Sequence, residues 1–181
     1  MLSVLLVQIP WHDNDEVTDG MDNAFLGKYL IIIGYKLSDY KKFSKILVGV
    51  DGSEHSMNAA DYAISFAVKY NSELILLYVI PVDLGLFNYS PPSIEEMEKE
   101  GQVHLDKIKS DALKIDKNLQ VKTELIASPS VVGGIVDFAD KENIDLIVVG
   151  TKGRSGLKKL LLGSVASGIV NYTHCPVIIY R

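Results

Sequence analysis

The chain has 181 residues, of which 48% are apolar, and a net charge of −5, which predicts one folded domain rather than a disordered or nucleic-acid-binding protein. Its apolar runs fall well short of the roughly 20 residues that span a bilayer, and its first residues lack the basic segment of a signal peptide. With a single cysteine and therefore no internal disulfide, the sequence predicts a cytoplasmic protein without nucleic-acid or membrane partners.

Residues 1–44 follow no regular pattern. They contain an acidic, turn-like stretch at 12–23 and a short apolar run, YLIIIGYKL, at 29–37. We expect an N-terminal appendage of unclear structure, followed by a domain at 45–181. A later start, at Met21 or beyond, is the alternative interpretation.

From residue 45 onward, short apolar runs alternate with stretches of helical periodicity. Runs typical of fully buried strands lie at 45–50, 73–80 and 145–150, and the runs at 121–126 and 176–180 are typical of outer strands. Helices are predicted at 53–71, 93–117, 132–139 and 164–172, the first with Ser53 as its N-cap and Asn71 at its C-terminal end. This alternation predicts an α/β fold: a single doubly wound, five-stranded parallel sheet with helices on both faces, Rossmann-like. Ligands of such sheets bind outside the carboxyl ends of the strands, here after Val50 and Val149.

The segment GTKGRSGLKKLLLGS, at 150–164, directly follows the run 145–149, which is predicted to be buried. Gly150 and Gly153 permit a close approach of the backbone that a Cβ atom would block. Gly163 and Ser164 open a helix, and the free N–H groups at a helix start bind anions. We therefore expect this loop to bind phosphate.

Asp51 leaves the first strand at its carboxyl end, where a carboxylate can hold ribose hydroxyls or a divalent metal. A turn or helix-capping carboxylate is the alternative. Phosphate contacts alone barely reach micromolar affinity, so an apolar slot for a base is expected beside the loop. The end of the second strand, 78–80, is close enough in the predicted sheet to supply it.

Four basic residues follow the predicted strand at 145–150: Lys152, Arg154, Lys158 and Lys159. Each is either a phosphate ligand or part of a solvated face. The four histidines show no paired ligand spacing. Neither a structural zinc site nor a catalytic pair of histidines is therefore expected.

Residues 45–181 resemble the universal stress protein (UspA-like) family, in the segments KILVGVDGSEHSMNAADYAISFA, ELILLYVI, IVVGTKGRSGLKKLLLGSVASGIV and CPVIIY, taken in order. The resemblance implies strand order 3-2-1-4-5 and, usually, a homodimer. One branch of the family binds ATP, and another has lost the glycine loop. Since this sequence keeps the loop, the resemblance implies the ATP-binding branch, with ATP and an accompanying Mg²⁺ or Mn²⁺ as cofactors.

The family's contacts carry over to this chain by position. Phosphate contacts fall on Gly150, Gly153, Gly163, Ser164 and the backbone of Val165; the ribose or metal carboxylate falls on Asp51, and the adenine slot on Val79 with Val149 beside it. Lys152 stands where one member has histidine, and Ala166 where it has threonine. These departures affect hydroxyl contacts to the terminal phosphate rather than the glycine cradle.

The function favoured by these features is that of a regulatory, stress-response protein whose ATP state alters its surface for a protein partner. A slow ATPase or another nucleotide enzyme on the same fold is one alternative, although the sequence offers no obvious general base beside the phosphates. A nucleotide-free dimerisation module is the other, and the intact glycine loop disfavours it.

The apolar segment 176–180 is predicted to be an edge strand. An open edge of this kind invites pairing with another chain, and pairing with its own copy predicts a homodimer through 176–180. The alternative is that the N-terminal appendage covers this edge, with the apolar run at 29–37 as the candidate cover.

Overall fold

The structure is a computed structural model that describes residues 6–8, 24–26, 29–31, 43–82, 94–153 and 162–180. Its strands are β1 (Leu6–Gln8), β2 (Ala24–Leu26), β3 (Tyr29–Ile31), β4 (Lys45–Val50), β5 (Glu73–Pro81), β6 (Val121–Ser128), β7 (Leu146–Gly150) and β8 (Val177–Tyr180). Its helices are α1 (Glu54–Tyr70), α2 (Ile94–Ile115), α3 (Val131–Glu142) and α4 (Ser164–Tyr172).

Five parallel strands form the centre of the sheet in the order β6-β5-β4-β7-β8. Numbered along the chain from β4, this is the order 3-2-1-4-5, so the predicted fold class is confirmed. The buried strands β4, β5 and β7 are the continuous apolar runs seen in the sequence, because helices cover both of their faces.

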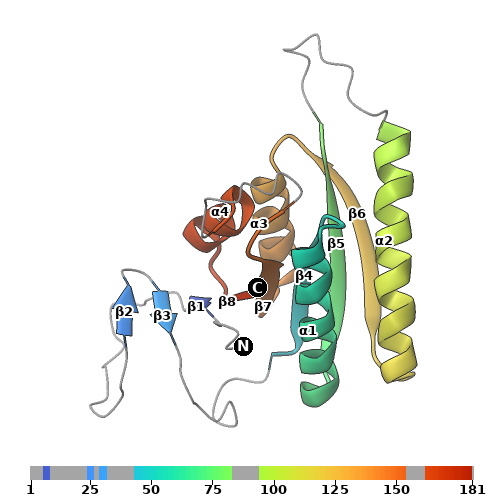
Figure 1. Ribbon diagram of the computed structural model, residues 1–181, viewed down its shortest axis with the longest axis horizontal. Coiled ribbons are helices and arrows are strands. Elements are labelled where there is room, and N and C mark those ends of the chain that lie inside the picture. Colours follow the sequence, from blue (N-terminus) through green and yellow to red (C-terminus); the bar gives the residue numbers. More distant parts are fainter. Residues whose placement is uncertain are drawn as a thin grey trace.

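The two faces of the sheet carry separate cores. Alternate residues of β4 divide between them: Ile46 and Val48 pack in the cluster covered by α1 and α2, whereas Leu47 packs in the cluster covered by α3 and α4. Figure 1 shows α1 and α2 on one side of the sheet and α3 and α4 on the other. Among the described residues, no helix is long and apolar enough to cross a membrane.

Local signals explain where the helices begin and end. Ser53 is the N-cap of α1, and its side chain accepts a hydrogen bond from the N–H of Ser56, while Asn71 ends the helix in the left-handed region at φ 54°. Ser130 and Asn143 do the same for α3. Helix α4 differs, because its N-cap is Gly163, which has no side chain that could accept a hydrogen bond from the first turn.

The N-terminal segment adds strands that the sequence pattern did not reveal. Strand β1 pairs antiparallel with the outer edge of β8, β3 pairs with β1, and β2 pairs with β3, so the sheet continues as β8-β1-β3-β2. The alternative interpretation of an edge covered by the appendage is therefore the arrangement in this structure, with 6–8 rather than 29–37 in contact with β8. The division of the chain at residue 44 stays a prediction.

Candidate functional site

A pocket of about 290 Å³ lies at the carboxyl ends of β4, β5 and β7, against the start of α4. Strands β4 and β7 are neighbours in the sheet, but the helices that follow them, α1 and α4, cover opposite faces. This is the point of an open α/β sheet at which ligands bind. All eight residues predicted for the site line the pocket: Asp51, Val79, Val149, Gly150, Gly153, Gly163, Ser164 and Val165.

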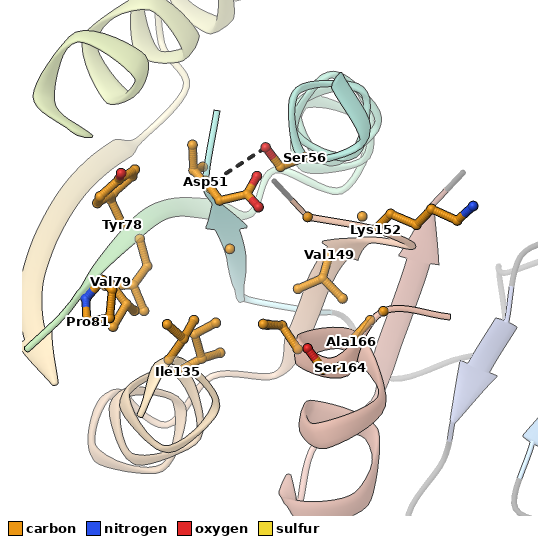
Figure 2. Close-up of a pocket in the computed structure, with 18 of the residues that line it drawn as sticks. Asp51, Ser56, Tyr78, Val79, Pro81, Ile135, Val149, Lys152, Ser164 and Ala166 are labelled. Carbon is orange, nitrogen blue, oxygen red and sulfur yellow. Dashed lines mark hydrogen bonds between the residues drawn. The ribbon is translucent and has the colours of Figure 1, made fainter. Parts of the chain in front are cut away.

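The pocket has a polar end and an apolar end (Figure 2). Val79, Pro81 and Ile135 lie together on one side, and Lys152, Ser164 and Ala166 lie on the other. The apolar side comes from the end of β5 and from α3. The polar side comes from the segment after β7 and from the first turn of α4.

The backbone holds the polar end in place. The N–H of Thr151 donates to the carbonyl of Tyr180 at 2.9 Å, and the N–H of Gly163 donates to the carbonyl of Thr151 at 2.7 Å. The first hydrogen bond of α4 runs from the N–H of Ser167 to the carbonyl of Gly163. The N–H groups of 164–166 therefore have no partner within the helix, and together with the helix dipole they favour an anion at this end of the pocket.

A Cβ atom on each of the three predicted loop glycines would meet a different neighbour. A Cβ atom on Gly150 would lie 2.7 Å from the backbone carbon and oxygen of His55, so this glycine lets α1 pack against β7. A Cβ on Gly153 would lie 2.6 Å from Oδ2 of Asp51. A Cβ on Gly163 would lie 3.1 Å from the carbonyl oxygen of Thr151, which is the oxygen that accepts the hydrogen bond from the N–H of Gly163. Only Gly153 and Gly163 therefore shape the polar end directly.

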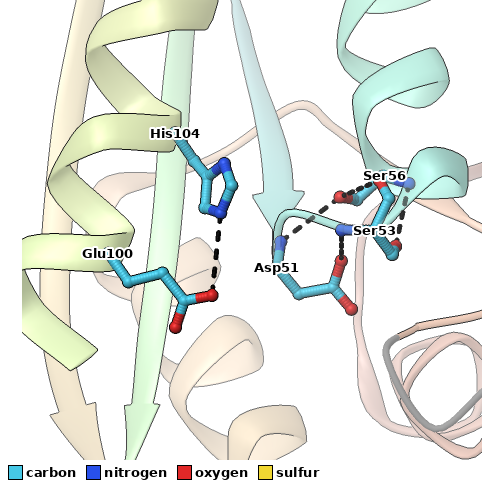
Figure 3. Close-up of polar contacts among 5 residues, drawn as sticks. All are labelled: Asp51, Ser53, Ser56, Glu100 and His104. Atoms are coloured by element: carbon cyan, nitrogen blue, oxygen red, sulfur yellow. Dashed lines mark hydrogen bonds and ion pairs between the residues drawn. The ribbon is translucent and has the colours of Figure 1, made fainter. Parts of the chain in front are cut away.

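Asp51 occupies the turn between β4 and α1 (Figure 3). Its Oδ1 accepts a hydrogen bond from the N–H of Ser53 at 3.0 Å, so the interpretation as a turn carboxylate is correct for this oxygen. The other oxygen is the one that lies near Gly153, and the residue lines the pocket. The hydroxyl of Ser53 donates to the carbonyl of Lys152 at 3.4 Å, which links this turn to the segment after β7.

Helix α2 packs over the same turn. Gly52 has φ +77°, and a Cβ atom there would collide with the imidazole of His104, which also lies 3.8 Å from Glu100 one turn earlier in α2 (Figure 3). In the same way, a Cβ on Gly101 would lie 2.7 Å from the ring of Tyr78. The turn that carries Asp51 is therefore held between α1 and α2.

Several lining residues were not predicted: Ser56, Pro81, Met97, Val131, Ile135 and Thr151. The spacing of Val131 and Ile135 places them on one face of α3, but the sequence does not say which face meets the pocket. Met97 comes from α2, and nothing near it in the sequence relates it to the glycine loop. Thr151 is 8% exposed, and its Oγ1 has no hydrogen-bond partner among the described residues.

Of the four basic residues near the loop, Lys152 lines the pocket, whereas Arg154, Lys158 and Lys159 lie outside the described residues. Asp51 is the one carboxylate among the described residues that line the pocket. The described part of the chain contains no group of three or more metal-ligating side chains. A divalent metal at this site would therefore need most of its ligands from a bound molecule or from water.

Comparison with known proteins agrees with this fold. The family model described as "Universal stress protein family" matches residues 42–181. A universal stress protein of Methanocaldococcus jannaschii is 34% identical over 158 residues, which cover 85% of this chain and 91% of that protein.

Solved structures with the same fold include the universal stress protein UspA from Lactobacillus plantarum, with a TM-score of 0.66 and 25% identity over 78% of this chain and all of that one. Another is a universal stress protein in complex with cAMP, with a TM-score of 0.61 and 25% identity over 78% of this chain and 99% of its own. With the match of the family model over residues 42–181 and this degree of identity, the chain belongs to the universal stress protein family.

Proposed function

We propose that this protein binds ATP, together with Mg²⁺ or Mn²⁺, in the pocket at the ends of β4, β5 and β7, and acts as a nucleotide-dependent regulatory protein. The observation that carries the proposal is a pocket with backbone N–H groups of the first turn of α4, which have no partner within that helix, at one end and apolar side chains at the other. A nucleotide matches both ends, because its phosphates suit the N–H groups and its base suits the apolar side chains.

The phosphates would contact the segment 150–153 and the first turn of α4. Three or four charge-assisted hydrogen bonds contribute about 1.5 to 3 kcal/mol each, whereas micromolar affinity requires about 8 kcal/mol after the cost of immobilising the ligand. The base must therefore contribute as well. Val79, Pro81 and Ile135 offer it an apolar surface beside the phosphate end.

The choice of an adenine nucleotide is supported by the solved relative in complex with cAMP. The residues also fit a metal that arrives with the phosphates, because Asp51 supplies one carboxylate at the polar end. Mg²⁺ is commonly held by one or two carboxylates together with substrate phosphates. A bound metal would neutralise phosphate charge there.

A regulatory role is favoured over rapid hydrolysis. The described lining residues include Asp51 but no histidine or second carboxylate that could act as a general base for an attacking water. The alternatives are a slow ATPase and a nucleotide-free module. Steady-state hydrolysis of many turnovers per second, abolished by Asp51→Ala while nucleotide still binds, would place the protein among the enzymes instead.

The direct test is isothermal titration calorimetry of the full chain with ATP in the presence of Mg²⁺, with AMP, cAMP and GTP as comparisons. Mass spectrometry of nucleotide that remains bound through purification gives an independent readout. We expect ATP to bind with micromolar or better affinity and GTP at least 10-fold more weakly. No binding of any adenine nucleotide would refute the proposal.

A further inference from the structure

The outer edge of β8 is held by a strand from the far end of the same chain. Strand β1 runs antiparallel to β8, with Leu6 opposite Ile179 and Gln8 opposite Val177. In Figure 1, β1 lies beside β8 on the side of the sheet away from β7. This is the same edge that a homodimer through 176–180 would need.

The backbone of β8 shows which of its groups face that edge. N–H groups at and just after β7 donate to the carbonyls of Pro176 and Tyr180, at 3.0 and 2.9 Å. Successive residues of a strand direct their N–H and C=O groups to opposite sides, so Ile178 also faces β7. Val177 and Ile179 therefore direct their backbone groups away from β7, toward the outer edge.

Strand β1 provides partners for both of these residues. Leu6 and Gln8 are the residues opposite them, and in an antiparallel ladder such pairs exchange both of their N–H···O bonds. Val7, between them, stands opposite Leu30 of β3. The backbone groups of β1 therefore alternate in direction along the strand. Those of Leu6 and Gln8 bond to β8, and those of Val7 bond to β3.

The side chains of β8 already lie in the core of the chain. Val177 and Ile179 pack in the cluster covered by α3 and α4, and Ile178 packs in the cluster covered by α1 and α2. The apolar character of this strand is explained by that burial and does not require a second subunit. What the edge offers to a partner is therefore its row of backbone N–H and C=O groups.

We propose that β1 is an internal competitor that occupies the edge of β8 and prevents a second copy of this chain from pairing there. A strand in the same chain meets its edge at an effective concentration of about a millimolar, whereas a second copy is present at micromolar concentration. For pairings of equal strength, the intramolecular strand is therefore favoured over the second copy by the ratio of these concentrations, roughly 1,000-fold. Release of β1 exposes Val177 and Ile179 and allows two β8 strands to form a two-fold pair.

The test compares the full chain with a form that contains residues 42–181. This shorter form corresponds to the whole length of solved relatives, so it is expected to fold alone. Light scattering at micromolar concentration should give a monomer for the full chain and a dimer for residues 42–181. In the full chain, the amide hydrogens of Val177 and Ile179 should exchange at least about 100-fold more slowly than in an unfolded peptide.

Ile178 is the internal control for exchange, because its N–H faces β7 whether or not the edge is covered. A second test keeps the full chain and replaces Leu6 and Gln8 with proline, which removes the two N–H donors that face β8. This variant should dimerise. The matched variant with alanine at both positions keeps the donors and should stay monomeric.

Three results would overturn the proposal. The first is a full chain that dimerises as tightly as residues 42–181. The second is a monomeric full chain in which Val177 and Ile179 exchange at unprotected rates while Ile178 stays protected. The third is a shorter form that stays monomeric at every concentration at which the full chain is studied.

Discussion

The carboxylate of Asp51 lies against Gly153, so that a Cβ atom on Gly153 would come within 2.6 Å of Oδ2 of Asp51. One residue follows β4 and the other follows β7, the two neighbouring strands whose ends form the pocket. The sequence predicted the acidic residue and the glycine loop as separate parts of a site. In the structure they are one unit, because the glycine leaves the space that the carboxylate occupies.

Gly153→Ala should therefore weaken nucleotide binding without unfolding the protein. The added methyl group forces the Asp51 carboxylate out of its position, and that carboxylate is also bonded to the N–H of Ser53. We expect the affinity for ATP to fall at least 10-fold, or about 1.4 kcal/mol. Calorimetric titration measures the affinity, and urea unfolding should show a change of less than about 1 kcal/mol.

Gly133→Ala is the matched control for this substitution. A Cβ on Gly133 would make an ordinary contact, 3.4 Å from the Cβ of Ser130, and this residue of α3 does not line the pocket. Alanine in a helix is favoured over glycine by about 1 kcal/mol, so the control should be as stable as the parent or more so. An equal loss of ATP affinity in both variants would show that the effect is not specific to Gly153 and its contact with Asp51.

Gly150→Ala should act on stability instead. The new Cβ atom would lie 2.7 Å from backbone atoms of His55 in α1, and backbone cannot rotate away as a side chain can. We expect a loss of about 1 to 3 kcal/mol in the free energy of unfolding, typical of overpacking. Urea unfolding without nucleotide checks this, and an unchanged midpoint would show that α1 shifts at little cost.

The core strands were predictable because a strand buried on both faces is a continuous run of apolar residues in the sequence. Runs such as 146–149 are apolar at every position, and turn signals and caps such as Ser53 and Asn71 mark the helices between them. The position of the pocket then follows from parallel topology alone. The spaced glycines after the run 146–149 were equally visible, and Gly150, Gly153 and Gly163 each lie where a Cβ atom would come close to a neighbouring atom.

The parts that were not predictable depend on which surfaces meet. Strand β1 has three residues, too few for a periodic pattern, so its pairing with β8 left no signal in the sequence. Glycine disfavours a helix by about 1 kcal/mol relative to alanine, yet Gly134 of α3 is explained by packing. A Cβ there would lie 2.9 Å from the Cβ of Ser128 and 3.1 Å from Val79. The close approach of α3 to the pocket is therefore a tertiary effect.

Stability at high pH should depend on Tyr62. Burial raises the pKa of this side chain, and the neighbouring Tyr70 and Tyr180 raise it further. Because the pKa in the folded state exceeds the ordinary value of about 10, the free energy of unfolding should be fully retained below pH 10 and should fall as the pH rises through the folded-state pKa.

Tyr62→Phe removes the titrating hydroxyl and keeps a ring to stack on Tyr180, 5.1 Å away between centroids. The variant should lose less stability than the parent between pH 8 and about pH 11, as measured by urea unfolding. Equal losses in the two proteins would assign the alkaline transition to other groups.

Asp51→Asn should separate the two roles that the sequence left open for this residue. The amide oxygen of asparagine can still accept the hydrogen bond from the N–H of Ser53, so the turn is preserved while the charge is lost. If the carboxylate contacts a nucleotide-bound metal, ATP affinity should fall at least 10-fold with Mg²⁺ and change much less with EDTA. If it contacts ribose hydroxyls, affinity should fall by the same factor in both conditions.

Asp61→Asn is the control, because it removes the same charge from an exposed position of α1 and should leave both affinities unchanged. Retention of full affinity by Asp51→Asn with and without Mg²⁺ would leave Asp51 with a structural role alone.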